Sequence, residues 1–390
     1  MRILFLCGSL EPGRDGVGDY TRSLAGECAR RGHACAIIAL HDPGITRETG
    51  GSAGPVRLVR LPAGEAWAGR LGRAVDVLRD FAPDWVSWQF VAYGFHPRGV
   101  VPAALWRGAA DLRGPRCHVM LHELWIGLED GSGWRARASG WPQRRGVLRL
   151  LARLRPDRLQ TSNPSYQEAL ARAGFAAGVL GLFGNVPVPA GPAASNGKFA
   201  RWLPAPAGPA AGSPLVAVTF GTLHPQWRPV ATVEWLLATS RRLGRPPALI
   251  VIGRAGSHAA AILEPFRQRG VPTGLTGELD AAAVSQLLCA ADFGIAPHPW
   301  ALIGKSGAAA AMLEHGLPVL VPRDDWRLRG APPFPLPAPD PLLARLAGLD
   351  AAGTDRWLAN RRRPESALPR IADALLEDLG HSPLRSLVHA

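Results

Sequence analysis

The feature that most constrains the fold is a repeated order of buried strand, glycine turn and amphipathic helix. Residues 2–7 are an apolar run that ends at Gly8, and apolar positions at helical spacing follow over 20–28. A second apolar run then spans 34–40. Continuous apolar strands joined by helices are typical of a parallel sheet that is buried on both faces.

Further apolar runs of strand length continue this order along the chain. They span 56–61, 85–90, 117–121 and 158–161 in the first half, and 215–220, 248–252, 272–275, 293–296 and 318–321 in the second. Residues 191–213, between the two series, are rich in Pro, Ala and Gly and are predicted to be a linker. The pattern predicts an α/β chain with two Rossmann-like domains facing across a cleft, 1–190 and 214–355. C-terminal helices in 356–390 are predicted to pack back on the first domain.

Length and composition fit this architecture. The 390 residues suffice for two ordinary domains, and no apolar run approaches the length of a membrane span. The chain begins directly with its first strand and shows no signal peptide, so we expect it in the cytoplasm. The five cysteines are scattered through apolar segments without CxxC spacing, which predicts packing residues, not a disulfide framework or a zinc site.

The positive charge of the chain is carried almost entirely by arginine. The formal net charge is +13, yet Lys198 and Lys305 are the only lysines. Such a bias is what a GC-rich genome produces, and without a nucleic-acid-binding module we expect no nucleic-acid partner. Against this background Lys305 stands out, because a slim lysine suits a narrow phosphate pocket better than the broad arginine fork does.

The segment around Lys305 is the sharpest motif. Ser306 suits a helix N-cap, and the alanine run after it predicts a helix that ends near Gly316. The backbone N–H groups of Gly307 and Ala308 can approach an anion there, beside the charge of Lys305. An ordinary capped core helix has the same local pattern, and that alternative stays open.

A second cluster follows the strand 117–121. His122 and Glu123 stand at the strand end, where a histidine can carry a proton near pH 7 and a carboxylate can orient it or bind sugar hydroxyls. A hydrogen-bonded structural histidine is the alternative for His122, and we expect His118, on the same strand, to be structural. No HExxH pattern is present, so we expect no metal site.

Two further segments are candidates for binding an acceptor. Gln89 and Tyr93 lie in an aromatic and polar stretch, 88–96, after another strand, and could form a platform for a ligand or a core and loop. The stretch 134–158 mixes arginines with tryptophans. It could lie on an anionic membrane surface or form a solvated helix face, and the second interpretation is favoured in an arginine-biased chain.

Several motifs taken in order resemble the glycosyltransferases of the GT-B fold, particularly family 4. The matching segments are Gly16-Val17-Gly18-Asp19-Tyr20, Thr161-Ser162-Asn163, Phe183-Gly184-Asn185-Val186-Pro187, Thr219-Phe220-Gly221-Thr222-Leu223, Val251-Ile252-Gly253, Gly274-Leu275-Thr276-Gly277-Glu278-Leu279, Leu288-Cys289-Ala290-Ala291-Asp292 and the segment 301–320. The resemblance covers most of residues 1–325. It implies a donor site in the second domain and an acceptor site in the first.

The resemblance also implies a role for each residue. For the donor diphosphate it implies Gly221, Thr222, Arg228, Arg254, Lys305, Ser306, Gly307 and Ala308, with Gly16 and Gly18 near the sugar. Leu275 and Thr276 would border the base, and Glu314 would bind the ribose hydroxyls. For the acceptor it implies Asp19 and His122, beside the candidates Gln89 and Tyr93. The catalytic set is His122, Glu123 and Lys305.

The chain departs from the family at one point. Alignment on Gly316 places Ile303 and Ala311 where the family carries two glutamates, so the sugar-recognising acid is missing or is replaced by Lys305 or His298. A surface role for Glu314 is the alternative to a ribose contact.

The function implied is metal-independent transfer of a sugar, with retention, from a UDP- or GDP-sugar to an unidentified sugar, lipid-linked or small-molecule acceptor. No cofactor is expected, and contact with the inner membrane is an open alternative. Two other functions are a nucleotide-sugar epimerase of the same architecture and a non-catalytic nucleotide-sugar-binding subunit.

Overall fold

The computed structural model describes residues 1–189, 199–203, 213–331 and 340–381. The chain forms two compact units. Of the described residues, the first contains Met1–Gly181, Arg327–Ala331 and those from Leu368 onward, and the second contains those of Leu182–Trp326 and of Pro332–Ala367. The expected linker, 191–213, lies largely outside the described residues.

The first unit is built on an eight-stranded sheet with the order β3-β4-β2-β1-β5-β6-β7-β8. Its strands are β1 (Arg2–Cys7), β2 (Ala34–Asp42), β3 (Thr49–Ala53), β4 (Val56–Pro62), β5 (Trp85–Phe90), β6 (Arg116–Leu121), β7 (Arg158–Thr161) and β8 (Gly178–Val179). All neighbours pair in parallel except β3, which forms an antiparallel hairpin with β4. The central strands are buried, apart from Arg2 at the start of β1, as a sheet covered on both faces requires.

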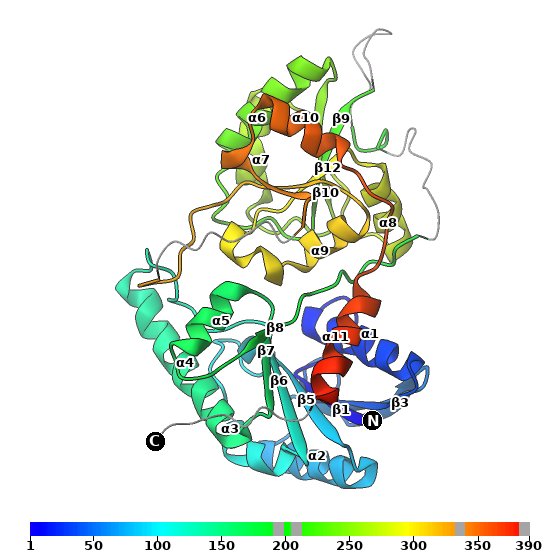
Figure 1. Cartoon of the computed structure of the whole chain (residues 1–390), viewed down its shortest axis with the longest axis vertical. Coiled ribbons are helices and arrows are strands. Elements are labelled where there is room, and N and C mark those ends of the chain that lie inside the picture. The colour runs from blue at the N-terminus through cyan, green and yellow to red at the C-terminus, as the bar shows by residue number, and fades with distance from the viewer. Residues whose placement is uncertain (190–198, 204–212, 332–339, 382–390) are drawn as a thin grey trace. The chain divides into compact units, whose positions relative to one another are not determined.

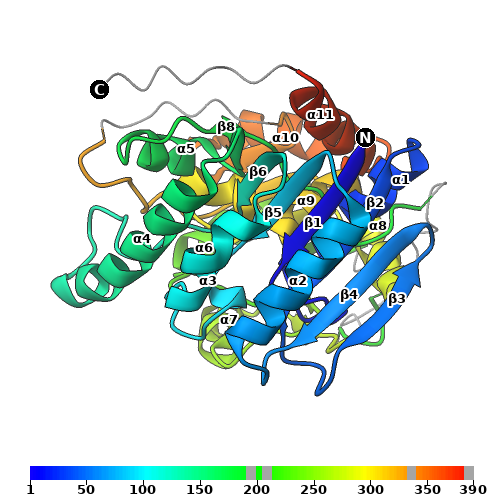
Figure 2. The ribbon, with the colours of Figure 1, turned by 90° about the horizontal axis from the view of Figure 1, so that it is seen from below.

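Helices connect these strands. They are α1 (Gly16–Arg30), α2 (Trp67–Phe81), α3 (Ala103–Gly108), α4 (Trp134–Leu154), α5 (Pro164–Ala171) and α11 (Leu368–Gly380), with the short 3-10 turns η1 (Ala92–Gly94) and η2 (Ala109–Leu112). Helix α2 packs on β1 and β2 with α3 beside it (Figure 2). Helix α1 packs on β1, β2 and β5.

The second unit contains a six-stranded parallel sheet with the order β11-β10-β9-β12-β13-β14. The strands are β9 (Leu215–Phe220), β10 (Pro247–Ile252), β11 (Thr273–Leu275), β12 (Phe293–Ile295), β13 (Val319–Val321) and β14 (Leu343–Arg345). The helices are α6 (Val230–Leu243), α7 (Ala259–Gln268), α8 (Ala281–Ala290), α9 (Gly307–Glu314) and α10 (Ala351–Ala359), with the 3-10 turns η3 (Trp300–Lys305) and η4 (Leu346–Gly348).

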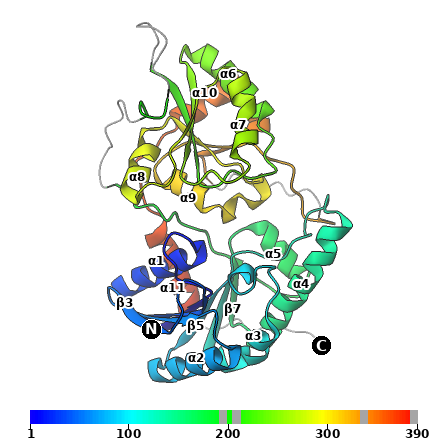
Figure 3. The ribbon, with the colours of Figure 1, turned by 180° about the vertical axis from the view of Figure 1, so that it is seen from behind.

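The second sheet has one hydrophobic core on each face. Residues of α6, α7 and α10 join one core, in which Trp235, Phe293 and Trp357 make edge contacts with ring centroids 5.5 to 6.1 Å apart. Residues of α8 and α9 join the other core. Helices α6 and α7 lie side by side in Figure 3.

The last described helix, α11, belongs to the first unit although the second unit separates it from that unit in sequence. It lies beside α1 (Figure 1), and its buried face carries Ile371, Leu375 and Leu379. The Arg31 Nε is 2.6 Å from an Asp373 oxygen, and the Arg158 Nε is 3.1 Å from an Asp378 oxygen. Helix α10, by contrast, lies in the second unit.

The expected strands are present near their expected places, whereas β8 and β14 were not predicted. The hairpin strand β3 was not predicted either. Its sequence, Thr49-Gly50-Gly51-Ser52-Ala53, has no apolar pattern, because it lies at the sheet edge and is exposed. The parallel sheets and the two Rossmann-like units confirm the expected α/β class.

His118, at the centre of β6, confirms the expected structural role. Its side chain is fully buried between Ser87 Oγ, 2.8 Å from Nδ1, and Gln160 Oε1, 3.0 Å from Nε2. Burial lowers the pKa of His118 to about 4, because the charged imidazole loses its hydration there. The folded chain therefore holds this histidine neutral.

We expect the free energy of unfolding to fall as the pH drops from about 6.5 toward 4. In this interval the unfolded chain protonates a histidine that the native chain keeps neutral, at a cost of up to about 1.4 kcal/mol per pH unit for each such group. His118→Gln should lower stability at pH 7.5 and flatten the pH dependence. Urea unfolding at pH 7.5, 6.0 and 5.0 measures both effects.

The exposed His258 provides a matched control, since His258→Gln removes a histidine without touching the core. If the free energy of unfolding of His118→Gln depended on pH as that of the unchanged chain does, this would contradict the assignment of His118 as a buried neutral histidine.

Candidate functional site

Loops from three strands of the second sheet meet at its carboxyl edge. The order places β9 between β10 and β12, so the connections that leave β9 and β12 diverge to opposite sides there. In an open parallel sheet this switch point is where ligands bind. His224 follows β9, His298 follows β12 and Arg323 follows β13.

Arg323 is the centre of this group. Its side chain is only 4% exposed, and its guanidinium lies 2.8 Å from His224 Nδ1, 3.1 Å from Gln226 Oε1 and 2.9 Å from an Asp325 oxygen. Arg323 does not stand out in the sequence, because one arginine among so many carries no signal. Its position two residues after β13, at a strand end, is the signal that could have identified it.

The two histidines join Arg323 to the start of α9. The rings of His224 and His298 meet edge to face at 5.9 Å, and His298 Nδ1 lies 3.2 Å from Ser306 Oγ. Burial first, and then the charge of Lys305, lowers the pKa of His298 to about 4. Burial, and then the charges of Arg323 and Lys305, also lower the pKa of His224 below its ordinary value. Both histidines are neutral near pH 7, while Lys305 and Arg323 supply the positive charge.

Helix α9 begins as predicted. Ser306 is its N-cap, and the Ser306 hydroxyl accepts a hydrogen bond from the Ala309 amide at 3.2 Å. The first amides of a helix have no acceptor within the helix itself. In the part of the chain that the structure describes, no other acceptor contacts the amides of Gly307 and Ala308, so they remain available to an anion.

The other predicted donor residues lie around the same sheet edge. Gly221, with a φ of +79°, and the exposed Thr222 follow β9 directly. Leu275 is 46% exposed at the end of β11, and the Thr276 hydroxyl accepts from the Gly253 amide at 3.0 Å. Arg228 is exposed, and its side chain donates to Pro225 O.

Arg254 also lies at this edge, after β10, and forms an exposed ion pair with Glu278 at 2.7 Å. This pairing gives its guanidinium a carboxylate partner within the unit, which a donor phosphate would have to displace.

Glu314 requires a correction. It is 4% exposed, so the surface role considered for it is wrong. Its Oε1 accepts from the Gly184 amide at 3.0 Å and from the Ala367 amide at 3.1 Å, so it ties both segments to the end of α9. These bonds give the carboxylate a structural role in place of the expected ribose contact.

The two positions where the resembled family carries glutamates are apolar here. Ile303 and Ala311 are buried in the same hydrophobic core. A side chain on Gly184 would come within 2.6 Å of the Ala311 Cα, so the segment at Gly184 crosses α9 in close contact.

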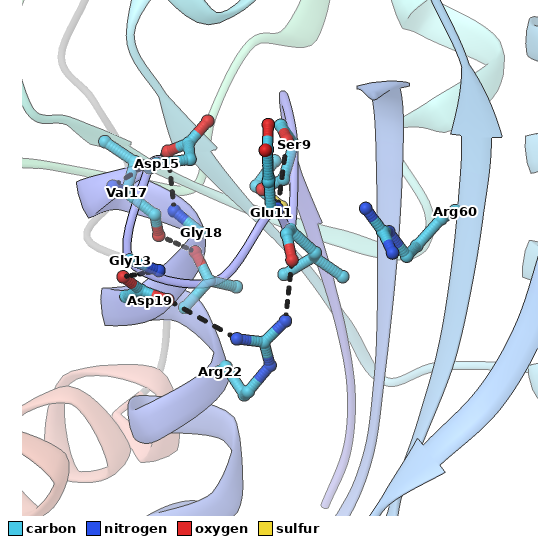
Figure 4. A network of polar contacts seen from close by, with 12 residues as sticks. Ser9, Glu11, Gly13, Asp15, Val17, Gly18, Asp19, Arg22 and Arg60 are labelled. Carbon is cyan, nitrogen blue, oxygen red and sulfur yellow. Dashed lines mark hydrogen bonds and ion pairs between the residues drawn. The ribbon is translucent and has the colours of Figure 1, made fainter. Parts of the chain in front are cut away.

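In the first unit, the loop after β1 is held by its own carboxylates (Figure 4). Asp15 caps α1 and accepts from the amides of Val17 and Gly18 at 3.0 and 2.8 Å. Asp19 accepts from the Gly13 amide at 3.0 Å and pairs with Arg22 at 3.4 Å. Burial raises the pKa of both Asp15 and Asp19.

This geometry gives Gly18 a structural reason to be a glycine, and its donor role stays a prediction. Its amide is already bonded to Asp15, and a Cβ there would lie 2.3 Å from Ser9 O, so Gly18 allows two backbone segments to approach. Gly16 is the exposed first residue of α1, and its donor role stays a prediction. Asp19 positions the loop, and its acceptor role also stays a prediction.

His122 lies at the end of β6 as expected, but it does not titrate near pH 7. Its ring is buried against the edge of Tyr20, at 4.9 Å, and burial lowers the pKa of His122 to about 3. Burial disfavours the imidazolium that a proton carrier needs, because its solvation is lost, and the catalytic role of His122 stays a prediction. A hydrogen-bonding role for the neutral ring is compatible with this site.

Gln89 is only 1% exposed, so it is not the acceptor contact that was expected. Its Oε1 lies 3.0 Å from His122 Nε2, and it thereby orients the ring. Tyr93 is 41% exposed, and its hydroxyl accepts from Gln143 at 3.1 Å. Glu123 is half-buried beside His122. For Tyr93 and Glu123 the acceptor and catalytic roles stay predictions.

Helix α4 presents arginines and tryptophans to solvent. Trp134 is 72% exposed and Trp141 is 60% exposed. Six arginines and no acidic residue lie on this helix. Beside it is a cavity of about 550 Å³ with apolar walls that include Trp125 and Leu328, and with Arg137 and Arg144 among its arginines.

Several broader properties accompany these sites. The five cysteines are buried and unpaired, as their apolar surroundings predicted. Within the described residues, no group of three or more His, Cys, Asp or Glu side chains is arranged to hold a metal ion. None of the described helices combines the length and apolarity needed to cross a membrane.

No protein-family profile matches the sequence. No curated protein matches it either. Solved structures do match. HepE from Anabaena, in complex with UDP and glucose, aligns with a TM-score of 0.57 and 15% identity over 97% of this chain and 99% of HepE. WaaG, a glycosyltransferase involved in lipopolysaccharide biosynthesis, aligns with a TM-score of 0.54 and 14% identity over 95% of each chain.

A third structure belongs to an epimerase. UDP-GlcNAc 2-epimerase from Neisseria meningitidis, bound to UDP-GlcNAc, aligns with a TM-score of 0.50 and 11% identity over 97% of this chain and 99% of the epimerase. At these identities the likeness concerns the fold. Together with the two parallel sheets, it establishes that the chain has the GT-B fold of two Rossmann-like units.

Proposed function

We propose that the chain is a glycosyltransferase that uses a nucleoside diphosphate sugar. The observation that carries the proposal is the group of cations and helix amides at the carboxyl edge of the second sheet. Lys305, Arg323 and the start of α9 converge there, beside two histidines that burial keeps neutral. Such a site suits a diphosphate, which carries concentrated negative charge.

The same charges would assist the reaction. In glycosyl transfer, the bond between the sugar C1 and the diphosphate oxygen breaks, and a bond from C1 to the acceptor oxygen forms. The acceptor hydroxyl gives up its proton, which the departing diphosphate oxygen takes. The electron pair of the broken bond stays on the diphosphate, whose added charge Lys305, Arg323 and the α9 amides stabilise. We propose that these groups act without a metal ion, and that the sugar is transferred with retention.

Incubation of the protein with UDP- and GDP-sugars tests the proposed function. Slow release of UDP or GDP without an acceptor, with a free sugar as the second product, supports a transferase, because water then replaces the acceptor. Binding without turnover supports the non-catalytic subunit. Absence of binding by every nucleotide sugar would overturn the proposal.

An epimerase is the second candidate, since UDP-GlcNAc 2-epimerase shares the fold. Appearance of an isomerised sugar still linked to its nucleotide would favour it. The transferase is preferred because, among the described residues, the positions where the resembled family carries its two glutamates offer no carboxylate to remove a proton from a sugar carbon, and Asp325 is paired with Arg323. Ile303 and Ala311 are apolar, and Glu314 is bonded to two amides.

Lys305→Ala should weaken binding of UDP or GDP about 10- to 100-fold, because one charge-assisted contact of about 1.5–3 kcal/mol is removed. Isothermal titration with the nucleoside diphosphate measures the change. Arg323→Lys should also weaken binding, because a single ammonium does not replace the guanidinium that spans His224 and Gln226.

Arg241→Ala, an exposed change on α6, is the matched control and should bind as the unchanged chain does. Thermal unfolding of each variant separates lost binding from lost fold. Equal affinity of a folded Lys305→Ala variant would show that the diphosphate does not lie at this turn.

For the acceptor side, we propose that the exposed face of α4 rests on an anionic membrane surface, so that a lipid-linked acceptor can reach the first unit. Exposed tryptophans suit the interfacial region of a bilayer, and the arginines suit its negative headgroups. The cation–aromatic pair of Arg145 and Trp141, at 5.2 Å, keeps charge and ring on the same surface.

Replacing Arg137 and Arg144 by Gln should reduce binding to vesicles of phosphatidylcholine with 30% phosphatidylglycerol roughly 30-fold, at about 1 kcal/mol for each arginine. Vesicle co-sedimentation at 0.1 M salt measures this. Arg79→Gln, whose exposed side chain on α2 lies away from α4, removes one positive charge and is the control for each single replacement. Equal binding to vesicles of phosphatidylcholine alone would contradict the electrostatic origin.

A further inference from the structure

A continuous chain of hydrogen bonds crosses the interior of the first unit. Five bonds connect Asp378 of α11 to His122 through Gln160, His118, Ser87 and Gln89, with lengths of 3.0, 3.0, 2.8, 2.9 and 3.0 Å in that order. The four intervening side chains are each at most 6% exposed. We call this series the relay.

The Asp378 end of the relay has a fixed polarity. An ionised carboxylate only accepts hydrogen bonds, so Gln160 must direct its Nε2 toward Asp378 and its Oε1 toward His118. His118 then has to donate from Nε2. Because burial keeps this histidine neutral, its Nδ1 carries a lone pair and accepts.

The polarity continues through the remaining groups. The Ser87 hydroxyl has one proton and gives it to His118 Nδ1, so its oxygen accepts from Gln89 Nε2. Gln89 therefore presents Oε1 to His122, which has to donate from Nε2. Reversal of the whole series would place the Gln160 carbonyl oxygen against the Asp378 carboxylate, and reversal of the Gln89 amide alone would place its carbonyl oxygen against the Ser87 oxygen.

We infer that Asp378, on the last described helix, is a positioning residue that sets the tautomer of His122 through the relay. His122 carries its proton on Nε2 and a lone pair on Nδ1. The next step rests on the proposed function. His122 accepts a hydrogen bond from a sugar hydroxyl through Nδ1 and does not donate a proton to the substrate. The tautomer itself can be measured without substrate, so its test is independent of the transferase assignment.

Asp378 is itself held in place from the sheet. The Arg158 Nε lies 3.1 Å from its other carboxylate oxygen and donates to the Asp378 carbonyl at 3.0 Å, and a further Arg158 nitrogen donates to His381 O. One carboxylate oxygen of Asp378 thus contacts Arg158, and the other accepts the hydrogen bond from Gln160.

Nitrogen-15 NMR of histidine-labelled full-length protein at pH 7.5 reports the tautomer of each ring, and His118→Gln and His122→Gln assign the two signals. In the unchanged chain both rings should be protonated on Nε2 alone. In Asp378→Asn neither histidine should be restricted to one tautomer, because the asparagine amide can donate as well as accept a hydrogen bond. A second population, protonated on Nδ1, should therefore appear at each ring.

Ser87→Ala cuts the relay in the middle. It should leave His118 in the Nε2–H form, still tied to Asp378, while His122 gains a second tautomer. Asp378→Glu, which retains the carboxylate, should restore the single tautomer at both rings. Asp373→Asn, on the same helix and paired with Arg31 outside the relay, should change neither ring.

A merely structural role for Asp378 would lower the melting temperature in Asp378→Asn without changing either tautomer. The inference is therefore overturned if folded Asp378→Asn keeps both rings in the Nε2–H form. It is also overturned if Ser87→Ala alters His118 but not His122, or if the unchanged chain carries the His122 proton on Nδ1.

Discussion

Parallel strand pairing is the interaction on which the rest of this structure depends. Because parallel strands need crossover helices, each sheet is covered on both faces, and the carboxyl ends of its strands gather at one edge. In the second unit this gathering brings His224, His298 and Arg323 together, although about a hundred residues separate the first from the last. The cationic site is a consequence of topology, and no local sequence motif contains it.

Burial then determines how the titratable groups of both units behave. His118, His122 and His298 are all held neutral because the charged imidazole loses its hydration. In the second unit this leaves the charge near α9 to Lys305 and Arg323. In the first it turns histidines into directional hydrogen-bonding groups, each with one donor and one acceptor nitrogen, and that property makes a relay with a fixed polarity possible.

The sequence predicted most of the fold and part of the site, for identifiable reasons. Buried parallel strands such as 85–90 and 215–220 are unbroken apolar runs, and the structure places them at those bounds. Ser306 was recognisable as an N-cap because the alanine helix follows it directly. Gln89 and Glu314 were misjudged, because a polar residue near a strand or helix end gives no local sign that its partners are backbone or core groups far along the chain.

The position of α11 has a consequence for the synthesis of the chain. The partner that Gln160 and Arg158 need lies beyond the whole of the second unit in sequence, so the first unit leaves the ribosome with this part of its interior open. At ordinary translation rates the delay between Gly181 and Leu368 is roughly 10–40 s, far longer than most small domains need to collapse. The unit synthesised first is thus the one completed last, and the residues that the apolar face of α11 covers stay uncovered during that interval.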